Sequence, residues 1–146
     1  MSAQNIPEIT LKKNKTEFLA VDITSPKAAA DYCRQFYFDD IEIYESFFLL
    51  LLNRASKTIG YVKISQGGVC GTIVDPTLVA KYAIESLAKQ VILCHNHPSG
   101  RVDPSPQDIA VTEKIKAGLS LFDIRVADHI ILSADSYYSF GDEGRI

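Results

Sequence analysis

Apolar residues recur every three or four positions in three segments of this chain, and each segment begins with a capping residue followed by proline. This spacing after that start signal predicts three amphipathic helices. They are expected from Ser25-Pro26 to near Tyr37, from Asp75-Pro76 onward, and from Ser105-Pro106 to about Leu121. The apolar face of the second helix is expected to consist of Val79, Tyr82, Ala83 and Leu87.

Apolar and β-branched runs alternate with these helices and predict strands. Phe47–Leu52 is an uninterrupted apolar run of strand length, which predicts a central strand covered on both faces. Further strands are expected at Thr58–Ser65, Gln90–His95, Asp123–Leu132 and Tyr137–Phe140. Helices alternating with buried strands predict an α/β or α+β layer sandwich around one mixed sheet. Residues 1–15 are polar and aperiodic and predict a flexible N-terminal arm, so residues 16–146 are expected to form a single domain.

Composition fits this picture of one globular domain. The chain has 146 residues, of which 47% are hydrophobic and 23% charged, so a disordered or fibrous chain is excluded. A domain of this size buries enough surface to fold without disulfides or a structural metal. The net charge is −3, and the densest basic stretch is only Lys12, Lys13 and Lys15, so composition does not support an electrostatic DNA binder.

The cysteines and the length of the apolar runs indicate the cellular compartment of the protein. Cys33, Cys70 and Cys94 are odd in number and form no C-x-x-C pair, which argues against a disulfide framework and favours a reducing cytoplasm. The longest apolar run is six residues, far short of the roughly 20 that a spanning helix needs. The N-terminus also shows no signal peptide, so we expect a cytoplasmic protein that does not associate with a membrane.

Candidate chemistry is concentrated at the end of the strand predicted to finish at His95. Side chains alternate along a strand, so His95 and His97 are expected to point the same way, while Cys94 points the other way. Two imidazoles and a carboxylate are ordinary zinc ligands, and catalytic zinc sites leave the fourth position to water. Asp108, eleven residues after His97 and in the first turn of a predicted helix, is the candidate third ligand.

A plainer interpretation of the same residues stays open. Ser105, Pro106 and Asp108 are also typical of a helix start, with a serine cap, a proline and an acidic residue in the first turn. The combined spacing weighs against coincidence. In a chain with 3 histidines, a chance match to His-x-His, a serine eight residues on and an aspartate after three more is expected on the order of a few times in 10,000. His129 lies in an apolar strand, and we expect it to be a packed, hydrogen-bonded histidine rather than a ligand.

These residues resemble a known family. His95-Asn96-His97, Ser105 and Asp108 fit the JAMM signature of the MPN-plus metallohydrolases, and His-Asn-His-Pro-Ser-Gly is similar to the RadC-like branch of that family, the JAB domain. The resemblance extends over about residues 38–146. It includes the segments Gly71-Thr72-Ile73, Asp128-His129-Ile130-Ile131 and Ser139-Phe140-Gly141.

The resemblance implies a three-layer α/β/α sandwich similar to cytidine deaminase, with zinc held by His95, His97 and Asp108. It also implies a glutamate general base before the central strand, which is Glu45, with Glu42 as the alternative. Ser105 is then expected to stabilise the oxyanion that forms on a carbonyl. The implied activity is hydrolysis of a peptide or isopeptide bond in a protein or peptide substrate.

Some features depart from the family pattern, and other functions compete. Longer RadC-like proteins carry an N-terminal helix-hairpin-helix region, for which this chain has no room, and Asp75-Pro76-Thr77 stands where the family often has Pro-Arg-Glu. The competing functions are a RadC-like accessory role in DNA repair and a non-catalytic MPN scaffold. A zinc deaminase is disfavoured because it needs H-x-E and C-x-x-C, and here His97 occupies the place of that glutamate.

Overall fold

The structure is a computed structural model that describes residues 2–67 and 73–146. Its helices are α1 (Pro26–Cys33), extended by the 3-10 turn η1 (Arg34–Phe36), α2 (Pro76–Glu85) and α3 (Pro106–Ser120). Its strands are β1 (Ser46–Leu52), β2 (Thr58–Gln66), β3 (Gln90–Asn96), β4 (Arg125–Leu132) and β5 (Tyr137–Ser139). Every predicted helix and strand is present, with ends that shift by one or two residues.

Capping side chains explain where the helices begin. The Ser25 hydroxyl accepts a hydrogen bond from the Ala28 N–H at 3.0 Å, and the Asp75 carboxylate accepts one from the Thr77 N–H at 2.9 Å. Proline follows each cap, where its missing N–H costs the helix nothing. The two start signals identified in the sequence therefore act as caps in the fold, as Ser105 does at α3.

The five strands form one mixed sheet in the order β2-β1-β3-β4-β5. β1 is antiparallel to both β2 and β3, while β3 and β4 run parallel and β5 returns antiparallel to β4. A parallel pair needs a crossover, and α3 supplies it between β3 and β4. The mixed sheet that the sequence predicts is thereby confirmed.

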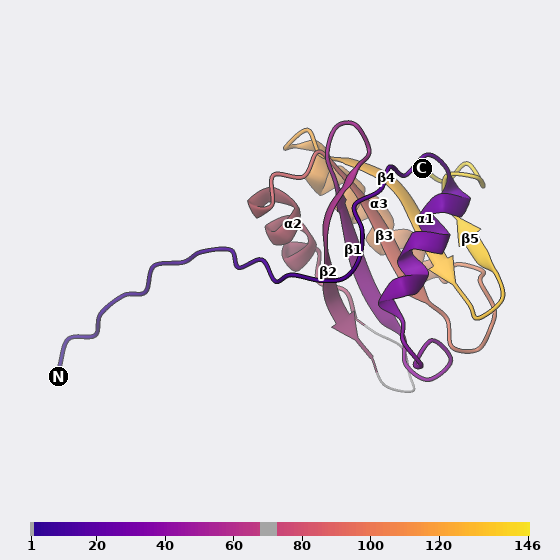
Figure 1. Ribbon diagram of the computed structural model, residues 1–146, viewed down its shortest axis with the longest axis horizontal. Coiled ribbons are helices and arrows are strands. Elements are labelled where there is room, and N and C mark those ends of the chain that lie inside the picture. The colour runs from indigo at the N-terminus through magenta and orange to yellow at the C-terminus, as the bar shows by residue number, and fades with distance from the viewer. Residues whose placement is uncertain (1, 68–72) are drawn as a thin grey trace.

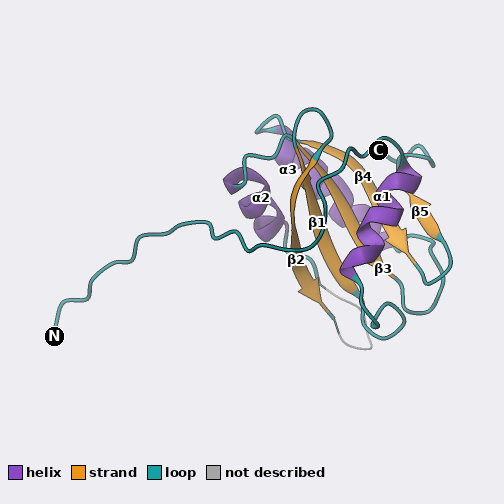
Figure 2. Ribbon diagram, viewed as in Figure 1, coloured by secondary structure: helices purple, strands orange, loops and turns teal. Residues whose placement is uncertain are grey.

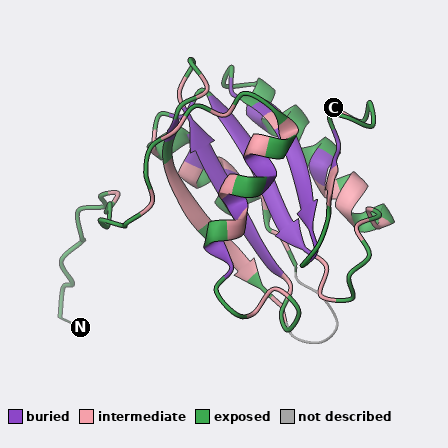
Figure 3. Cartoon of the chain, turned by 45° about the vertical axis from the view of Figure 1, so that its right-hand side comes forward, coloured by how far each residue is buried: buried purple, intermediate pink, exposed green. Residues whose placement is uncertain are grey.

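Helices cover both faces of the sheet (Figures 1 and 2). α1 and η1 pack on one face, against Phe48, Leu50 and Leu52. α2 and α3 pack on the other, against Phe47, Leu49 and Leu51. The apolar run of β1 thus feeds two separate cores, one on each side, and the expected three-layer α/β/α sandwich is confirmed. Figure 3 shows the buried central strands between the helices.

One residue predicted for the core lies at the surface. Leu87 is 79% exposed, because α2 ends at Glu85 and Leu87 adopts a left-handed conformation with φ of 60°. The Ala88 N–H donates to the Ala83 carbonyl and the Leu87 N–H to the Ile84 carbonyl, which is the Schellman pattern that ends helices. Glycine is the usual residue at this position, and a leucine there carries no stop signal, so the predicted apolar face extends two residues past the end of α2.

Residues 2–25 form no helix or strand, and Figure 1 shows the first part of this segment running away from the body of the molecule. Phe18 is the first aromatic residue to pack on the core, against Phe36 and Tyr61. The boundary between arm and domain at residue 15 stays a prediction. Among the described residues, no helix has the length and apolar character needed to cross a bilayer.

Candidate metal centre

His95 and His97 lie at the end of β3 and turn their rings toward each other. The two Nε2 atoms are 3.1 Å apart. The side chain of His95 is 2% exposed and that of His97 is 15% exposed, so one ring lies in the interior and the other at the surface of the site. The alternation expected for a strand therefore brings the two imidazoles together on one face.

Asp108 reaches the same point from the first turn of α3. Its Oδ1 lies 3.3 Å from Nε2 of His95, and its Oδ2 lies 3.2 Å from Nε2 of His97. Oδ2 also accepts the Ser105 N–H at 2.8 Å, while the Ser105 hydroxyl accepts the Asp108 N–H at 3.0 Å. The helix-cap interpretation and the ligand interpretation are therefore compatible, because the capping box aims the carboxylate at the histidines.

Charge is concentrated where these three side chains meet. Burial opposes ionisation of Asp108, but the contacts with the imidazoles of His95 and His97 outweigh burial and hold the pKa of the carboxyl well below its usual range. Burial likewise opposes the charged form of His97, yet the hydrogen bond to Asp108 prevails and the pKa of His97 is raised. The site favours a carboxylate beside cationic or metal-bound imidazole.

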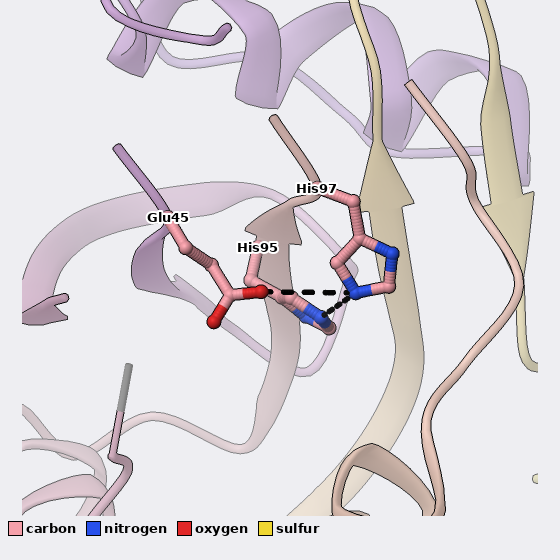
Figure 4. A group of neighbouring side chains, drawn as sticks. All are labelled: Glu45, His95 and His97. Carbon is pink, nitrogen blue, oxygen red and sulfur yellow. Dashed lines mark hydrogen bonds and ion pairs between the residues drawn. The ribbon is translucent and has the colours of Figure 1, made fainter. Parts of the chain in front are cut away.

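Glu45 points its carboxylate toward His97 (Figure 4). It directly precedes β1, and its Oε1 lies 3.8 Å from Nε2 of His97. Ligand atoms of Glu45, His95 and His97 all lie within 4.8 Å of one another, so this group can hold a metal ion. The alternative acid, Glu42, is exposed in the turn before it.

The carboxylates of Asp108 and Glu45 thus both face the imidazoles of His95 and His97. Their distances from the imidazole nitrogens differ. Tetrahedral zinc with ligand bonds of 2.0–2.2 Å separates its ligand atoms by about 3.3 Å. The contacts of Asp108 with the two rings, at 3.3 and 3.2 Å, match that spacing, whereas Glu45 stands farther away at 3.8 Å. The donor set of two imidazoles and a carboxylate fits zinc, with room for a second carboxylate beside it.

A chain of buried polar side chains behind His95 was not anticipated from the sequence. Nδ1 of His95 lies 2.8 Å from Nε2 of His129, and Nδ1 of His129 lies 2.6 Å from the Thr112 hydroxyl. That hydroxyl donates to the backbone carbonyl of Asp108 at 2.6 Å. His129 is fully buried, and burial lowers its pKa well below the ordinary value. The expected packed, hydrogen-bonded histidine is found. The available signal for Thr112 was its place one helical turn after Asp108.

Asn96, between the two histidines, points to the opposite face of β3 and holds the segment that carries Glu45. Its amide nitrogen donates to the carbonyls of Ile41 and Tyr44 at 2.6 and 2.7 Å, and its oxygen accepts the Ser46 N–H at 2.8 Å. The side chain is completely buried. These three bonds fix the backbone on both sides of Glu45.

Cys94 lies away from the site, as the strand alternation predicts. It belongs to the core cluster beneath α1 together with Cys33, and both thiols are free and buried. Contact with Cys94 and burial raise the pKa of the Cys33 thiol well above its usual range. Cys70 and the resemblance segment Gly71-Thr72 lie outside the described residues.

Fold and site together define a JAB domain, and comparison with known proteins agrees. A family profile described as the RadC-like JAB domain matches residues 23–145, so the chain belongs to that family. The match begins ahead of residue 38, where the sequence resemblance was expected to start, and includes α1.

Curated relatives carry the name UPF0758 protein. One from Flavobacterium johnsoniae is 46% identical over 101 residues, which cover 69% of this chain and 44% of the relative. One from Porphyromonas gingivalis is 44% identical over 101 residues, with 68% and 44% covered. The UPF0758 protein YfjY of Escherichia coli (strain K12) is 36% identical over 136 residues, with 93% and 84% covered. The chain therefore spans less than half the length of the first two relatives and most of the third.

Proposed function

We propose that this domain is a zinc-dependent metallohydrolase of the JAMM type. The observation that carries the proposal is the convergence of His95, His97 and Asp108, whose ligand atoms lie 3.1 to 3.3 Å apart. That spacing and donor set suit a tetrahedral zinc ion with one position left for water. Membership in the RadC-like JAB family supports the proposal.

Each of the three residues would hold the metal through a different ligand atom. His95 supplies a buried Nε2, His97 a partly exposed one, and Asp108 a carboxylate already aligned by the Ser105 N–H. A bound zinc ion lowers the pKa of a coordinated water to about 7 and polarises a substrate carbonyl.

Glu45 is assigned the proton transfers. Its carboxylate lies beside the metal ligands but farther from His97 than Asp108 does, which suits a general base rather than a ligand. It accepts the proton of the attacking water and delivers it to the leaving nitrogen. The Ser105 hydroxyl already accepts the Asp108 N–H, so its own proton serves as a donor to the developing oxyanion.

The proposed substrate is a peptide or isopeptide bond in a protein partner, within the cytoplasm. A competing role in DNA repair finds no support in the charge, since the chain carries a net charge of −3. Fluorescence anisotropy with single-stranded and branched DNA across a salt series tests it. Tight, steeply salt-dependent binding together with an absence of hydrolysis would favour the DNA role over ours.

Elemental analysis of the purified protein tests the metal site directly. We expect about one zinc per chain in the wild type and in Glu45→Gln, and little or none in His97→Ala or Asp108→Asn. Glu113→Gln is a matched control, because Glu113 is an exposed acid on the same helix as Asp108. Zinc retained in Asp108→Asn but lost in Glu45→Gln would mean that Glu45 is the third ligand and would sink its assignment as base.

Measured hydrolysis of test substrates distinguishes an enzyme from a non-catalytic MPN scaffold. With a panel of amide and isopeptide substrates, we expect Glu45→Gln to lose hydrolysis while keeping zinc, and His97→Ala to lose both. A zinc-loaded wild type that cleaves no member of the panel would favour a non-catalytic MPN role.

A further inference from the structure

A hydrogen-bonded circuit, open at its ends, links two of the proposed ligands through groups that are not ligands. It runs from the ring of His95 to His129 on β4, then to Thr112 on α3, and back to the backbone carbonyl of Asp108. His95, His129 and Thr112 are each at most 1% exposed as whole residues, so the hydrogen-bonding groups of the circuit are shielded from bulk water. The circuit joins β3, β4 and α3 at the metal site.

The direction of every proton in this circuit follows from one group. The Asp108 carbonyl can only accept, so the Thr112 hydroxyl must donate to it across the 2.6 Å contact. The hydroxyl oxygen then accepts from Nδ1–H of His129, also at 2.6 Å. A neutral imidazole with its proton on Nδ1 has a lone pair on Nε2, so Nε2 of His129 accepts from Nδ1–H of His95.

The reverse arrangement breaks one of these contacts. If the Thr112 proton pointed to His129, two acceptor oxygens, the hydroxyl and the Asp108 carbonyl, would face each other at 2.6 Å without a proton between them. His129 would then donate from Nε2, and neutral His95 would carry its proton on the nitrogen that faces Asp108. Such a His95 could not bind a metal until it changed tautomer.

We infer that Thr112 and His129 are positioning residues that hold His95 with its proton on Nδ1 and its lone pair on Nε2, prepared for a metal ion. The inference rests on the proposed metal site. Outer partners of this kind fix the orientation and tautomer of ligating histidines, and their loss typically costs about 10-fold to 100-fold in metal affinity.

Ring packing holds the circuit in place. Phe140 stacks on His129, with centroids 4.6 Å apart and planes 12° apart, and Phe47 lies parallel to His95 at 5.7 Å. His97 is held separately, because its Nδ1 lies 2.8 Å from the carbonyl of Arg101, which can only accept. Both proposed imidazole ligands are therefore directed through Nδ1, one by a loop carbonyl and the other by the buried circuit.

The tautomer of His129 tests the inference in the wild type and without a substrate. Long-range nitrogen–proton NMR of the metal-free protein, labelled at histidine and held near pH 8, reports which nitrogen carries the proton. We expect the proton of His129 on Nδ1. A proton on Nε2 of His129 would overturn the inference, and no variant is needed for this result.

Zinc affinity of two threonine variants provides the second arm. Thr112→Val keeps the shape and removes the hydroxyl, while Thr112→Ser keeps the hydroxyl and is the matched control. In chelator competition we expect Thr112→Val to bind zinc about 10-fold to 100-fold more weakly and Thr112→Ser to stay within about 3-fold of the wild type. Equal zinc affinity of Thr112→Val and wild type would also overturn the inference.

The two proposals fail in different ways. If the wild type binds no zinc but has the expected His129 tautomer, the metallohydrolase proposal is refuted. The circuit then has only a structural role. If the wild type binds zinc but His129 is protonated on Nε2 in the metal-free protein, the metal-site proposal stands. The positioning role of Thr112 and His129 is then refuted.

Discussion

At the scale of single residues, the motif His95-Asn96-His97 has two sides. The histidines face the proposed metal site, while Asn96 faces the other way and fixes the backbone around Glu45. The sequence predicted the histidine side from alternation along a strand. It could not predict the asparagine side, because the carbonyls that Asn96 binds belong to residues more than 50 positions earlier.

Replacement of Asn96 tests that second side. Asn96→Ala leaves the buried Ser46 N–H and the partly buried carbonyls of Ile41 and Tyr44 without their partner, at about 1–3 kcal/mol each. We expect the free energy of unfolding in urea to fall by at least about 3 kcal/mol. Amide exchange should speed up around residues 41–46. Asn53→Ala, which loses two bonds in an exposed turn, is the control and should cost less. Equal costs would contradict this account of Asn96.

Asp128 gives a pH dependence with a defined sign. Burial raises its pKa above the ordinary value, against hydrogen bonds from the Ser139 hydroxyl and the backbone N–H groups of Gly141 and His129. A carboxyl with a raised folded-state pKa stabilises the fold fully below its unfolded pKa of about 3.9, and this contribution is lost as pH rises through the folded pKa. We therefore expect the stability of the wild type relative to Asp128→Asn to decline from about pH 4 upward in denaturant titrations. A relative stability that rises over this range would show that the hydrogen bonds outweigh burial.

At the scale of elements, the three helix starts and the end of α3 were predictable, and the end of α2 was not. A serine or aspartate followed by proline is a local signal, and all three such pairs open a helix. α2 and α3 end on Schellman patterns in which Leu87 and Asp123 adopt positive φ. Aspartate tolerates this conformation, whereas leucine rarely adopts it, so the sequence carries no local signal for the end of α2.

The strained end of α2 predicts a stabilising substitution. Leu87 holds φ of 60° and is 79% exposed, so its side chain contributes little packing while its backbone bears the cost of a left-handed conformation, about 1–2 kcal/mol. Leu87→Gly relieves that strain but adds freedom to the unfolded chain, so we expect a net gain of about 0.5–1 kcal/mol. Thermal unfolding measures it. A lower melting temperature would mean that Leu87 makes contacts that outweigh the strain.

Two serine variants test whether Ser105 only caps α3 or also takes part in catalysis. Ser105→Ala and Ser25→Ala each remove a hydroxyl that accepts one helix N–H, so each should cost about 1 kcal/mol of stability. Only Ser105 lies at the proposed site. We expect hydrolysis to fall about 100-fold or more in Ser105→Ala and to stay unchanged in Ser25→Ala. Equal activity in the two variants would reduce Ser105 to a cap.

At the scale of the whole molecule, the layers could be predicted because β1 is apolar on both faces and therefore needs cover on both. The convergence of Glu45, His95 and Asp108 could be proposed only from spacing and family resemblance, since their approach depends on how β1, β3 and α3 meet. The buried partners of His95 could not be predicted at all. A histidine and a threonine on apolar faces carry no sign that they face each other.

The two apolar cores imply that the fold does not depend on the metal. No proposed metal ligand belongs to either core, so we expect the chelator-treated protein to stay folded by circular dichroism. Zinc at 100 times its dissociation constant should add about 2.7 kcal/mol, which raises the melting temperature by about 5–11 °C. His97→Ala should show no such rise. Unfolding of the wild type on metal removal would contradict the self-sufficient cores.

The strand order also sets the time at which the site is completed as the chain is synthesised. β3 carries both histidines, but it pairs on one side with β1, which is made earlier, and on the other with β4, which is made about 30 residues later. His129, the partner of His95, lies on that later strand. A nascent chain that ends before β4 has every proposed ligand and still leaves β3 with an open edge. The proposed metal centre is therefore expected to acquire the hydrogen-bond partner of His95 only when β4 docks, late in the synthesis of the domain.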